Sequence, residues 1–429
     1  MRIVGCAIAP LALIVAWAQT VTSPQDSTKD SLYGLRAQAM KAYTDKHYGE
    51  AVRLFDAAFS AGLNRDEDAY NAACSAALAG DRVKALEYLN QAARLGYRDA
   101  DHMQSDADLQ SVRSNSEFQR IVERVRQNEV AYRRKHGDPE GAAIVTTDMD
   151  LFWSLYDKLL SSSNPAGVLE NEYFRKGSPG LQDFIFARIT SGTDLWKTMQ
   201  AAPKYYAALR PATLRIHDFV PQIRTSFHKM KELYADSTFP DVYFLIGRMN
   251  SGGTTGPAGL LIGADMFGKT PSVPLDELSE WHRKVVGSVE SIPSIVAHEL
   301  IHYQQKTEGK TLLAAAIHEG SADFVGELIS GVDDHFNHEA RTYGLQHEPE
   351  LWAQFSQEMH GTNTSHWMYE GKVVNGRPAD LAYFVGYRIS EAYYNQAADK
   401  KKAIVEILQC TDADKLLSVS GYQASTKKK

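Results

Sequence analysis

Residues 294–305 read Ser-Ile-Val-Ala-His-Glu-Leu-Ile-His-Tyr-Gln-Gln, and this stretch decides which fold we expect for the larger part of the chain. The preceding Ser291-Ile292-Pro293 is typical of a helix start, because proline is favoured in the first helical turn. On such a helix, His298 and His302 lie four residues apart and project from the same face. Two imidazole nitrogens on one rigid face supply two corners of a tetrahedral zinc site.

The glutamate within this motif suits a different task from the histidines. Glu299 is turned about 100° from His298 around the helix, so it can reach a water beside the metal without coordinating the metal itself. Two histidines on an amphipathic helix are, however, often ordinary helix-face residues. A third ligand at a workable distance therefore decides between a metal site and a plain helix.

A second helical stretch, from Leu312 to Phe324, offers that third ligand. It holds Glu319 and Asp323, which are four residues apart and therefore share one face. His318 is adjacent to Glu319, but it points about 100° away from it around the helix.

An alternative third ligand is Glu308, six residues after His302. The metzincin pattern places its ligand there, but that pattern needs a glycine three residues after the second histidine to turn the chain. This sequence has Gln305 at that position. The metzincin arrangement with Glu308 is therefore not favoured.

The order HExxH, a short connection and ExxxD resembles the gluzincins, the thermolysin-like zinc peptidases. The resemblance implies that Glu319 is the third zinc ligand, beside His298 and His302. It also implies that Asp323 accepts a hydrogen bond from the far nitrogen of His298 and fixes the tautomer of that imidazole.

These residues predict a hydrolytic mechanism. Zinc held by three protein ligands keeps a fourth position for water and lowers the pKa of that water. We expect Glu299 to be the general base that takes a proton from this water and passes it to the leaving amine. Tyr387 is the candidate that stabilises the oxyanion, although its aromatic-rich stretch is also typical of a packing helix.

Strand-like sequence occurs upstream of the HExxH helix. Residues 242–247 and 259–264 are apolar runs separated by a glycine-rich loop, and together they predict a β-hairpin. The glycine-rich loop has no Lys-Ser or Lys-Thr after it, so it does not fit a phosphate-binding loop. By resemblance to the gluzincins, residues 259–266 would supply the sheet edge that pairs with an extended substrate.

From about residue 145 to the end, the chain also resembles a family of predicted zinc-dependent proteases that is related to a gliding-motility lipoprotein. This resemblance implies a zincin-like metallopeptidase domain over residues 145–429. The segments that carry it are residues 246–253, the HExxH helix, residues 318–323 and residues 378–387.

The N-terminal part of the chain has an internal period. Ala51 and Ala85 lie 34 residues apart in similar surroundings, and a 34-residue period of small residues resembles the tetratricopeptide repeat. We therefore expect helical-hairpin repeats over residues 31–130, acting either as a partner-binding groove or as a spacer. The same offset pairs Ala39 with Ala73, Ala42 with Ala76, Phe55 with Leu89, and Ala58 with Ala92.

The first residues read as a targeting segment. Arg2 is followed by an apolar run to Trp17, and Ala16-Trp17-Ala18 offers a small-x-small cleavage site, so residues 1–18 predict a secretory signal. An uncleaved anchor is the alternative. With cleavage, the protein would be periplasmic or secreted and would keep no stable membrane span.

The 429-residue chain has a formal net charge of −7, which argues against nucleic acid as a partner. We expect a mainly α-helical protein with a small β-sheet. The predicted function is that of an exported zinc-dependent metallopeptidase acting on peptide or protein substrates, with a protein partner for the repeats. One alternative is a cell-envelope binding or assembly protein with a structural or vestigial zinc site. A zinc hydrolase of non-peptide amides would use the same residues.

Overall fold

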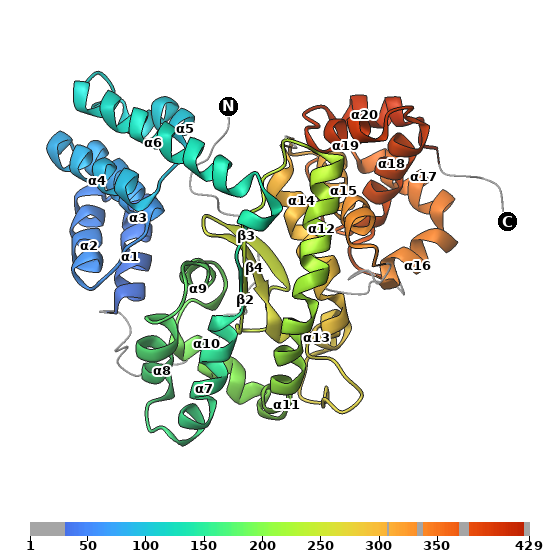
Figure 1. The fold of residues 1–429 in the computed structure, drawn as a ribbon, viewed down its shortest axis with the longest axis horizontal. Helices are drawn as coiled ribbons and strands as arrows, with labels where there is room; N and C mark the ends of the chain where they lie inside the picture. Colours follow the sequence, from blue (N-terminus) through green and yellow to red (C-terminus); the bar gives the residue numbers. More distant parts are fainter. Residues whose placement is uncertain (1–30, 307–308, 333–337, 369–376, 424–429) are drawn as a thin grey trace. The chain divides into compact units, whose positions relative to one another are not determined.

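The computed structural model describes residues 31–306, 309–332, 338–368 and 377–423. The predicted signal segment, residues 1–18, lies outside these ranges. The chain divides into two compact units after Lys135, and each unit is described by itself below. The structure is mainly α-helical with one small four-stranded sheet, as the sequence predicts (Figure 1).

Unit 1 consists of helical hairpins. Its first four helices form two successive pairs, and the second pair repeats the first at an offset of 34 residues, from Leu32 to Asp66. The alanines that the repeat places in register are buried between the helices, which lets the helices approach closely. The helices are α1 (Leu32–Thr44), α2 (Tyr48–Ser60), α3 (Asp66–Leu78), α4 (Arg82–Leu95), α5 (Ala100–Ser105) and α6 (Ser116–His136).

The charged stretch of residues 133–141 is largely helical. Helix α6 continues to His136, and a short 3₁₀ turn covers Pro139–Gly141. Unit 2 begins at His136, whose imidazole is buried and hydrogen-bonds the carbonyl of Phe239 at 2.8 Å within that unit.

Helices form the first part of unit 2, and two of them, α7 (Thr147–Ser161) and α9 (Pro179–Phe184), contact the sheet. Asn164-Pro165 and Ser178-Pro179 are helix starts, where the Asn164 and Ser178 side chains accept hydrogen bonds from backbone N–H groups. The helices are α7 (Thr147–Ser161), α8 (Pro165–Val168), α9 (Pro179–Phe184), α10 (Gly192–Ala201), α11 (Pro203–Leu214) and α12 (Val220–Leu233).

The sheet has the strand order β1-β2-β4-β3. Strand β1 (Ile144–Val145) pairs in parallel with β2 (Asp241–Leu245), and β2 pairs in parallel with β4 (Gly259–Gly263). Strand β3 (Gly253–Gly256) pairs with β4 in the antiparallel direction. Strand β3 is therefore one of the two edge strands among those that the structure describes, and β1 is the other.

The predicted hairpin between residues 242–247 and 259–264 is wrong. These two apolar runs form β2 and β4, which are parallel. The glycine-rich segment between them contains β3, and this extra strand reverses the chain so that β4 runs beside β2 in the same direction. All of β4 is buried, as is typical of a strand covered on both faces.

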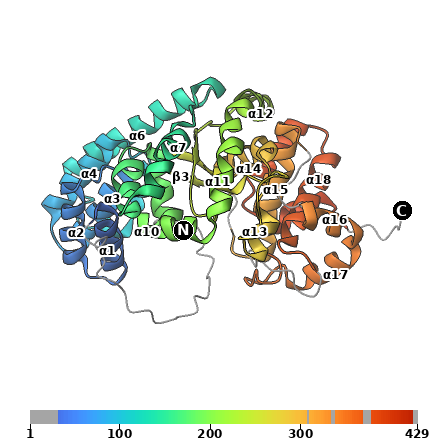
Figure 2. The ribbon, with the colours of Figure 1, turned by 90° about the horizontal axis from the view of Figure 1, so that it is seen from below.

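Three helices beside the sheet hold the candidate site. Helix α14 (Ile292–Gln304) contacts β3 and β4 on one side and α15 (Leu312–Ser330) on the other. Helix α18 (Leu381–Gln396) packs on α15, so that α15 lies between α14 and α18 (Figures 1 and 2).

Glycines allow these helices to approach closely. A Cβ atom at Gly320 would lie 2.1 Å from the backbone nitrogen of Tyr387, and one at Gly386 would lie 1.7 Å from the carbonyl oxygen of Ala316. A Cβ at Gly326 would lie 3.3 Å from the backbone nitrogen of His298. The position of α15 relative to both neighbours therefore depends on small residues at the crossings.

Four further helices contribute to a buried apolar cluster that includes Phe355, Trp367 and Leu381. They are α16 (His338–Gln346), α17 (Glu348–Glu358), α19 (Lys400–Leu408) and α20 (Ala413–Ser420). The short helix α13 (Glu280–Val285) has no residue in this cluster. Among the helices of the described ranges, none is both long enough and apolar enough to span a bilayer.

Candidate metal centre

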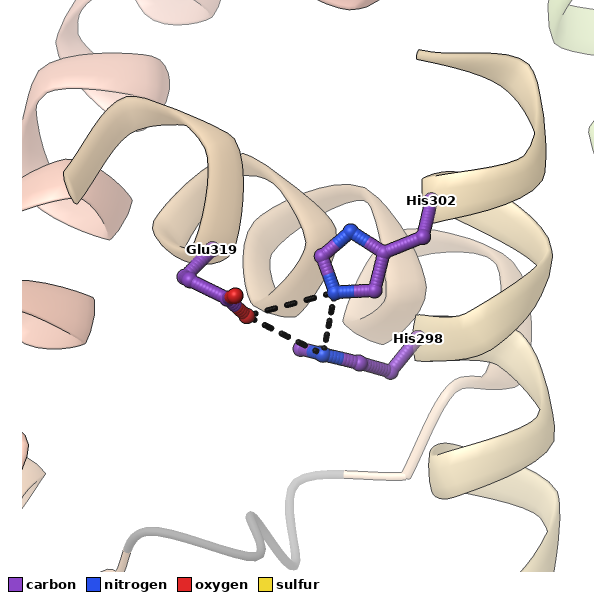
Figure 3. Close-up of side chains that lie close together, drawn as sticks. All are labelled: His298, His302 and Glu319. Atoms are coloured by element: carbon purple, nitrogen blue, oxygen red, sulfur yellow. Dashed lines mark hydrogen bonds and ion pairs between the residues drawn. The ribbon is translucent and has the colours of Figure 1, made fainter. Parts of the chain in front are cut away.

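Three side chains from two helices converge on one point (Figure 3). His298 and His302 project from α14, and their Nε2 atoms lie 2.9 Å apart. Glu319 projects from α15, and its Oε2 atom lies 3.2 Å from Nε2 of His302 and 3.6 Å from Nε2 of His298. The structure therefore brings together the three residues that the sequence predicts as metal ligands.

The geometry of these donors fits zinc. Two imidazoles and one carboxylate form a common ligand set for zinc in enzymes. Bonds of about 2.0–2.2 Å in a tetrahedral arrangement place neighbouring ligand atoms about 3.3–3.6 Å apart. The three separations of 2.9, 3.2 and 3.6 Å lie close to this range. The convergent set holds three donors among the described residues, so a zinc ion bound there would take its fourth ligand from outside this set.

Each histidine has a hydrogen-bond partner on its other ring nitrogen. Nδ1 of His298 donates to Oδ1 of Asp323 at 2.8 Å, as the gluzincin resemblance implies. Nδ1 of His302 donates to Oε1 of Gln305 at 2.7 Å. With the proton on Nδ1, each Nε2 atom keeps its lone pair directed toward Glu319 and the metal position.

Gln305 also connects the two helices of the site. Its amide nitrogen donates to the carbonyl of His318 at 2.7 Å and to the hydroxyl of Ser321 at 2.9 Å, both on α15. The sequence interpretation used Gln305 only to argue against a metzincin turn. Its position three residues after His302 places it next to that imidazole on the helix surface, so this spacing was the signal that could have identified it.

His318 lies beside the site without belonging to the convergent set. Its ring stacks on that of His302, with 4.6 Å between the centroids and 22° between the planes. Burial, with a contribution from the charge of His302, lowers the pKa of His318 to about 4. The other alternative ligand, Glu308, lies outside the described residues.

The electrostatics of the site favour a cation. Burial alone would raise the pKa of Glu319, but the charges and hydrogen bonds of His302 and His298 hold it well below its ordinary value. Burial alone would lower the pKa of His298, yet Asp323 and Glu319 raise it well above its ordinary value. The carboxylates around the two imidazoles thus stabilise positive charge at the point where the donors meet.

Glu299 lies on the side of α14 that faces the sheet. It is buried, and burial raises the pKa of its carboxyl above the ordinary value. A Cβ atom at Gly253 of β3 would lie only 2.4 Å from Oε1 of Glu299, so the absence of a side chain at Gly253 leaves room for the carboxylate. Edge strand β3 therefore runs directly beside the predicted general base.

This arrangement corrects the predicted substrate edge. Residues 259–266 include β4, which is an inner strand flanked by β2 and β3. An inner strand uses its backbone groups in pairing with both neighbours, so it cannot pair with a substrate. Strand β3 is the edge that adjoins Glu299.

Tyr387 is engaged away from the metal position. Its hydroxyl donates to Glu327 at 2.7 Å, and the guanidinium of Arg341 donates to that hydroxyl at 3.3 Å. Glu327 lies about two turns further along α15 than Glu319. The predicted role of Tyr387 at the oxyanion stays a prediction. Another tyrosine of α18, Tyr383, stacks on the ring of His298 with 6.5 Å between centroids.

Arg188 is a second residue that the sequence interpretation missed. It lies in a π-helical turn, and its charge interacts with that of Glu299. No motif marks this position, because about 110 residues separate it from the HExxH helix. The sheet alone brings the two segments together.

The fold and these residues define a class: an α+β protein with an HExxH helix whose two histidines converge with a glutamate on the following helix. A protein family described as Gliding motility protein GldB matches residues 143–424, which is most of the chain. The chain therefore belongs to this gliding-motility family, whose short name marks it as a lipoprotein family. Comparisons with curated proteins and with solved structures return no match.

Proposed function

We propose that unit 2 is a zinc-dependent hydrolase of peptide bonds that works in the cell envelope. The observation that carries the proposal is the combination of three convergent donors, His298, His302 and Glu319, with a buried carboxylate that is not one of them, Glu299. A purely structural zinc site has no use for a buried carboxylate beside the metal, whereas hydrolysis requires a general base there.

A zinc ion bound at these donors would supply Lewis-acid polarisation and lower the pKa of a water molecule. The chain's own residues divide the remaining work. Glu299 takes a proton from the attacking water on a carboxylate oxygen and returns it to the leaving amine nitrogen. Asp323 and Gln305 hold the two imidazoles in the tautomer that presents Nε2. Edge strand β3 offers backbone groups to an extended substrate.

The experiment replaces Glu299 with Gln, which keeps the shape of the side chain and removes the base. Hydrolysis of a mixed peptide library should fall by about a hundredfold to ten-thousandfold, while the bound zinc stays the same. Glu280→Gln is the matched control, because Glu280 is an exposed carboxylate on α13. Equal turnover by Glu299→Gln and wild type would refute the proposal.

The second candidate is a binding or assembly protein of the cell envelope, with a structural or vestigial zinc site. The family match favours it more directly than it favours hydrolysis, because the family is described by gliding motility and not by an enzymatic activity. The helical hairpins of unit 1 would then bind the protein partner. Stoichiometric zinc, no turnover of any library peptide and an unaltered Glu299→Gln variant would together support this candidate.

A further inference from the structure

Arg188 lies beside strand β3, next to the candidate site. The residue belongs to the π-helical turn η4 (Ile185–Ile189), and one of its terminal nitrogens donates to the hydroxyl of Thr254 at 3.2 Å. Thr254 follows Gly253, the residue that lies against Glu299. The Nε atom of Arg188 is buried and has no hydrogen-bond partner among the described residues.

The segment around Arg188 is fixed to the loop that leads into β3. The side-chain amide of Asn250 donates to the carbonyl of Arg188 at 2.9 Å. The guanidinium of Arg248 donates to the carbonyl of Ile189 at 3.2 Å. The loop and the turn are therefore held together at two points, and the guanidinium keeps its place beside the edge strand.

A partly buried guanidinium whose Nε donor has no acceptor among the described residues suits a ligand from outside the chain. Arginine stays protonated at all ordinary pH values, and a buried donor without an acceptor is unfavourable. Its planar fork matches the two oxygens of a carboxylate. Glu299 faces the same region, but no hydrogen bond joins it to Arg188 within the described residues, and its carboxylate is assigned to proton transfer.

We infer that Arg188 binds a carboxylate of the substrate that lies along β3. This inference rests on the proposed function, because it assigns a substrate class to the same site. The carboxylate comes either from the C-terminus of the peptide or from an acidic side chain. Both present the same planar group to the guanidinium, so the test must separate them.

The test uses the zinc-loaded full chain and the library peptide that it cleaves fastest. This peptide is prepared with a free or an amidated C-terminus, and with Glu or Gln at its acidic positions. Loss of the recognised carboxylate should lower kcat/KM of the wild type by about tenfold to a hundredfold. The change that causes this loss identifies the source of the carboxylate.

In Arg188→Gln the ratio of kcat/KM between charged and neutral peptides should fall to about one, because the group that recognises the carboxylate is gone. Arg188→Lys should keep part of the preference, because lysine retains the charge and loses the fork. Arg215→Gln is the control, since Arg215 pairs with Glu290 in a half-exposed position. An equal loss on charged and neutral peptides would overturn the inference and make Arg188 a partner of Glu299 alone.

If the wild type cleaves no peptide, the proposed function is refuted, but the role of Arg188 can still be decided by a binding measurement. The same peptides, labelled with a fluorophore, are then titrated with the zinc-loaded protein and followed by anisotropy. Binding that requires the carboxylate and is lost in Arg188→Gln supports the inference. Binding that is absent or insensitive to either change overturns it.

Discussion

Among the residues that the structure describes, each unit contains one group of side chains whose donor atoms lie close enough together to hold a metal. In unit 2 the group is His298, His302 and Glu319, and in unit 1 it is Cys74, Asp106 and Asp108. The two groups differ in what else their donor atoms touch. The donor atoms lie close together in both groups, so the residues around the donors decide which group is a metal site.

The donors of the unit 2 group face one common point. The Nδ1 atoms of both histidines are used by Asp323 and Gln305, and their Nε2 atoms point at Glu319. These two hydrogen bonds orient the imidazoles toward the common point. This is the arrangement that neighbours of a metal ligand provide.

The carboxylates of the unit 1 group are used by the protein itself. The hydroxyl of Tyr70 donates to Asp106 at 2.7 Å, and that of Tyr43 donates to Asp108. His102 lies 3.5 Å from Asp106 as well. These contacts join α1, α3 and the turn that follows α5, so we interpret the group as a hydrogen-bonded cluster that stabilises the packing of the repeats.

The largest expected effect is on zinc content. His302→Ala removes one ligand and the imidazole that Gln305 orients, so the purified protein should lose its stoichiometric zinc. Cys74→Ala should leave the zinc content unchanged. Elemental analysis of both variants after dialysis against trace zinc makes the measurement. Zinc lost from Cys74→Ala and kept in His302→Ala would reverse the comparison.

The titration of a buried carboxylate in unit 2 tests whether hydrogen bonds from the protein can stabilise such a group in place of a metal ion. Asp265 accepts hydrogen bonds from the backbone N–H groups of Gly247 at 2.9 Å and Met249 at 2.6 Å. Burial raises its pKa to about 6, and the neighbouring phenols of Tyr205 and Tyr206 stay protonated because burial raises their pKa values too.

Because the pKa of Asp265 is higher in the folded chain than in the unfolded chain, the folded state binds the extra proton between about pH 4 and pH 6. The free energy of unfolding should therefore fall as pH rises through this window, by about 3 kcal/mol for this group. Asp265→Asn should lack this component. Urea unfolding with a chelator present, from pH 4 to pH 7, compares the two proteins, and parallel pH profiles would contradict the assignment.

Tryptophan fluorescence reports this unfolding in unit 2 alone. Five of the six tryptophans lie in unit 2, at positions 153, 196, 281, 352 and 367, and the sixth is Trp17. Residues 31–135 contain none. Far-ultraviolet circular dichroism reports both units, so the two signals together separate them.

The neighbours of the metal ligands should matter less than the ligands. Gln305→Ala removes the acceptor for Nδ1 of His302 and two contacts to α15, and it should weaken zinc binding by about tenfold to a hundredfold. Competition with a chromophoric zinc chelator measures the affinity. Gln357→Ala on the exposed part of α17 is the control. Unchanged affinity in Gln305→Ala would show that α15 alone orients the imidazole.

The sequence predicted which side chains converge better than it predicted their surroundings. Helical spacing pointed to His298 and His302, and the resemblance to the gluzincins pointed to Glu319 and Asp323. Local spacing also predicted the helical pairs of unit 1, where the 34-residue period places alanines in the core.

The pairing of the strands in the sheet was not predictable from local spacing. The parallel pairing of β2 with β4 depends on where the short strand β3 inserts, and two apolar runs separated by glycines fit a hairpin equally well. For the same reason the edge was assigned to residues 259–266 when it lies at Gly253–Gly256. Arg188 reaches the site only through this edge, so its role depended on the topology.

The smallest expected effect concerns the hydrogen-bonded cluster of unit 1. Tyr43→Phe removes one hydrogen bond to Asp108 and should lower the stability of unit 1 by about 1 kcal/mol. The change should be visible in circular dichroism while tryptophan fluorescence and zinc content stay as in the wild type. Because the phenol and the carboxylate link α1 to the turn after α5, the loss should be confined to the repeats. A gain of zinc binding in this variant would instead mean that the phenol had been masking a second metal site, and the distinction between the two groups would fail.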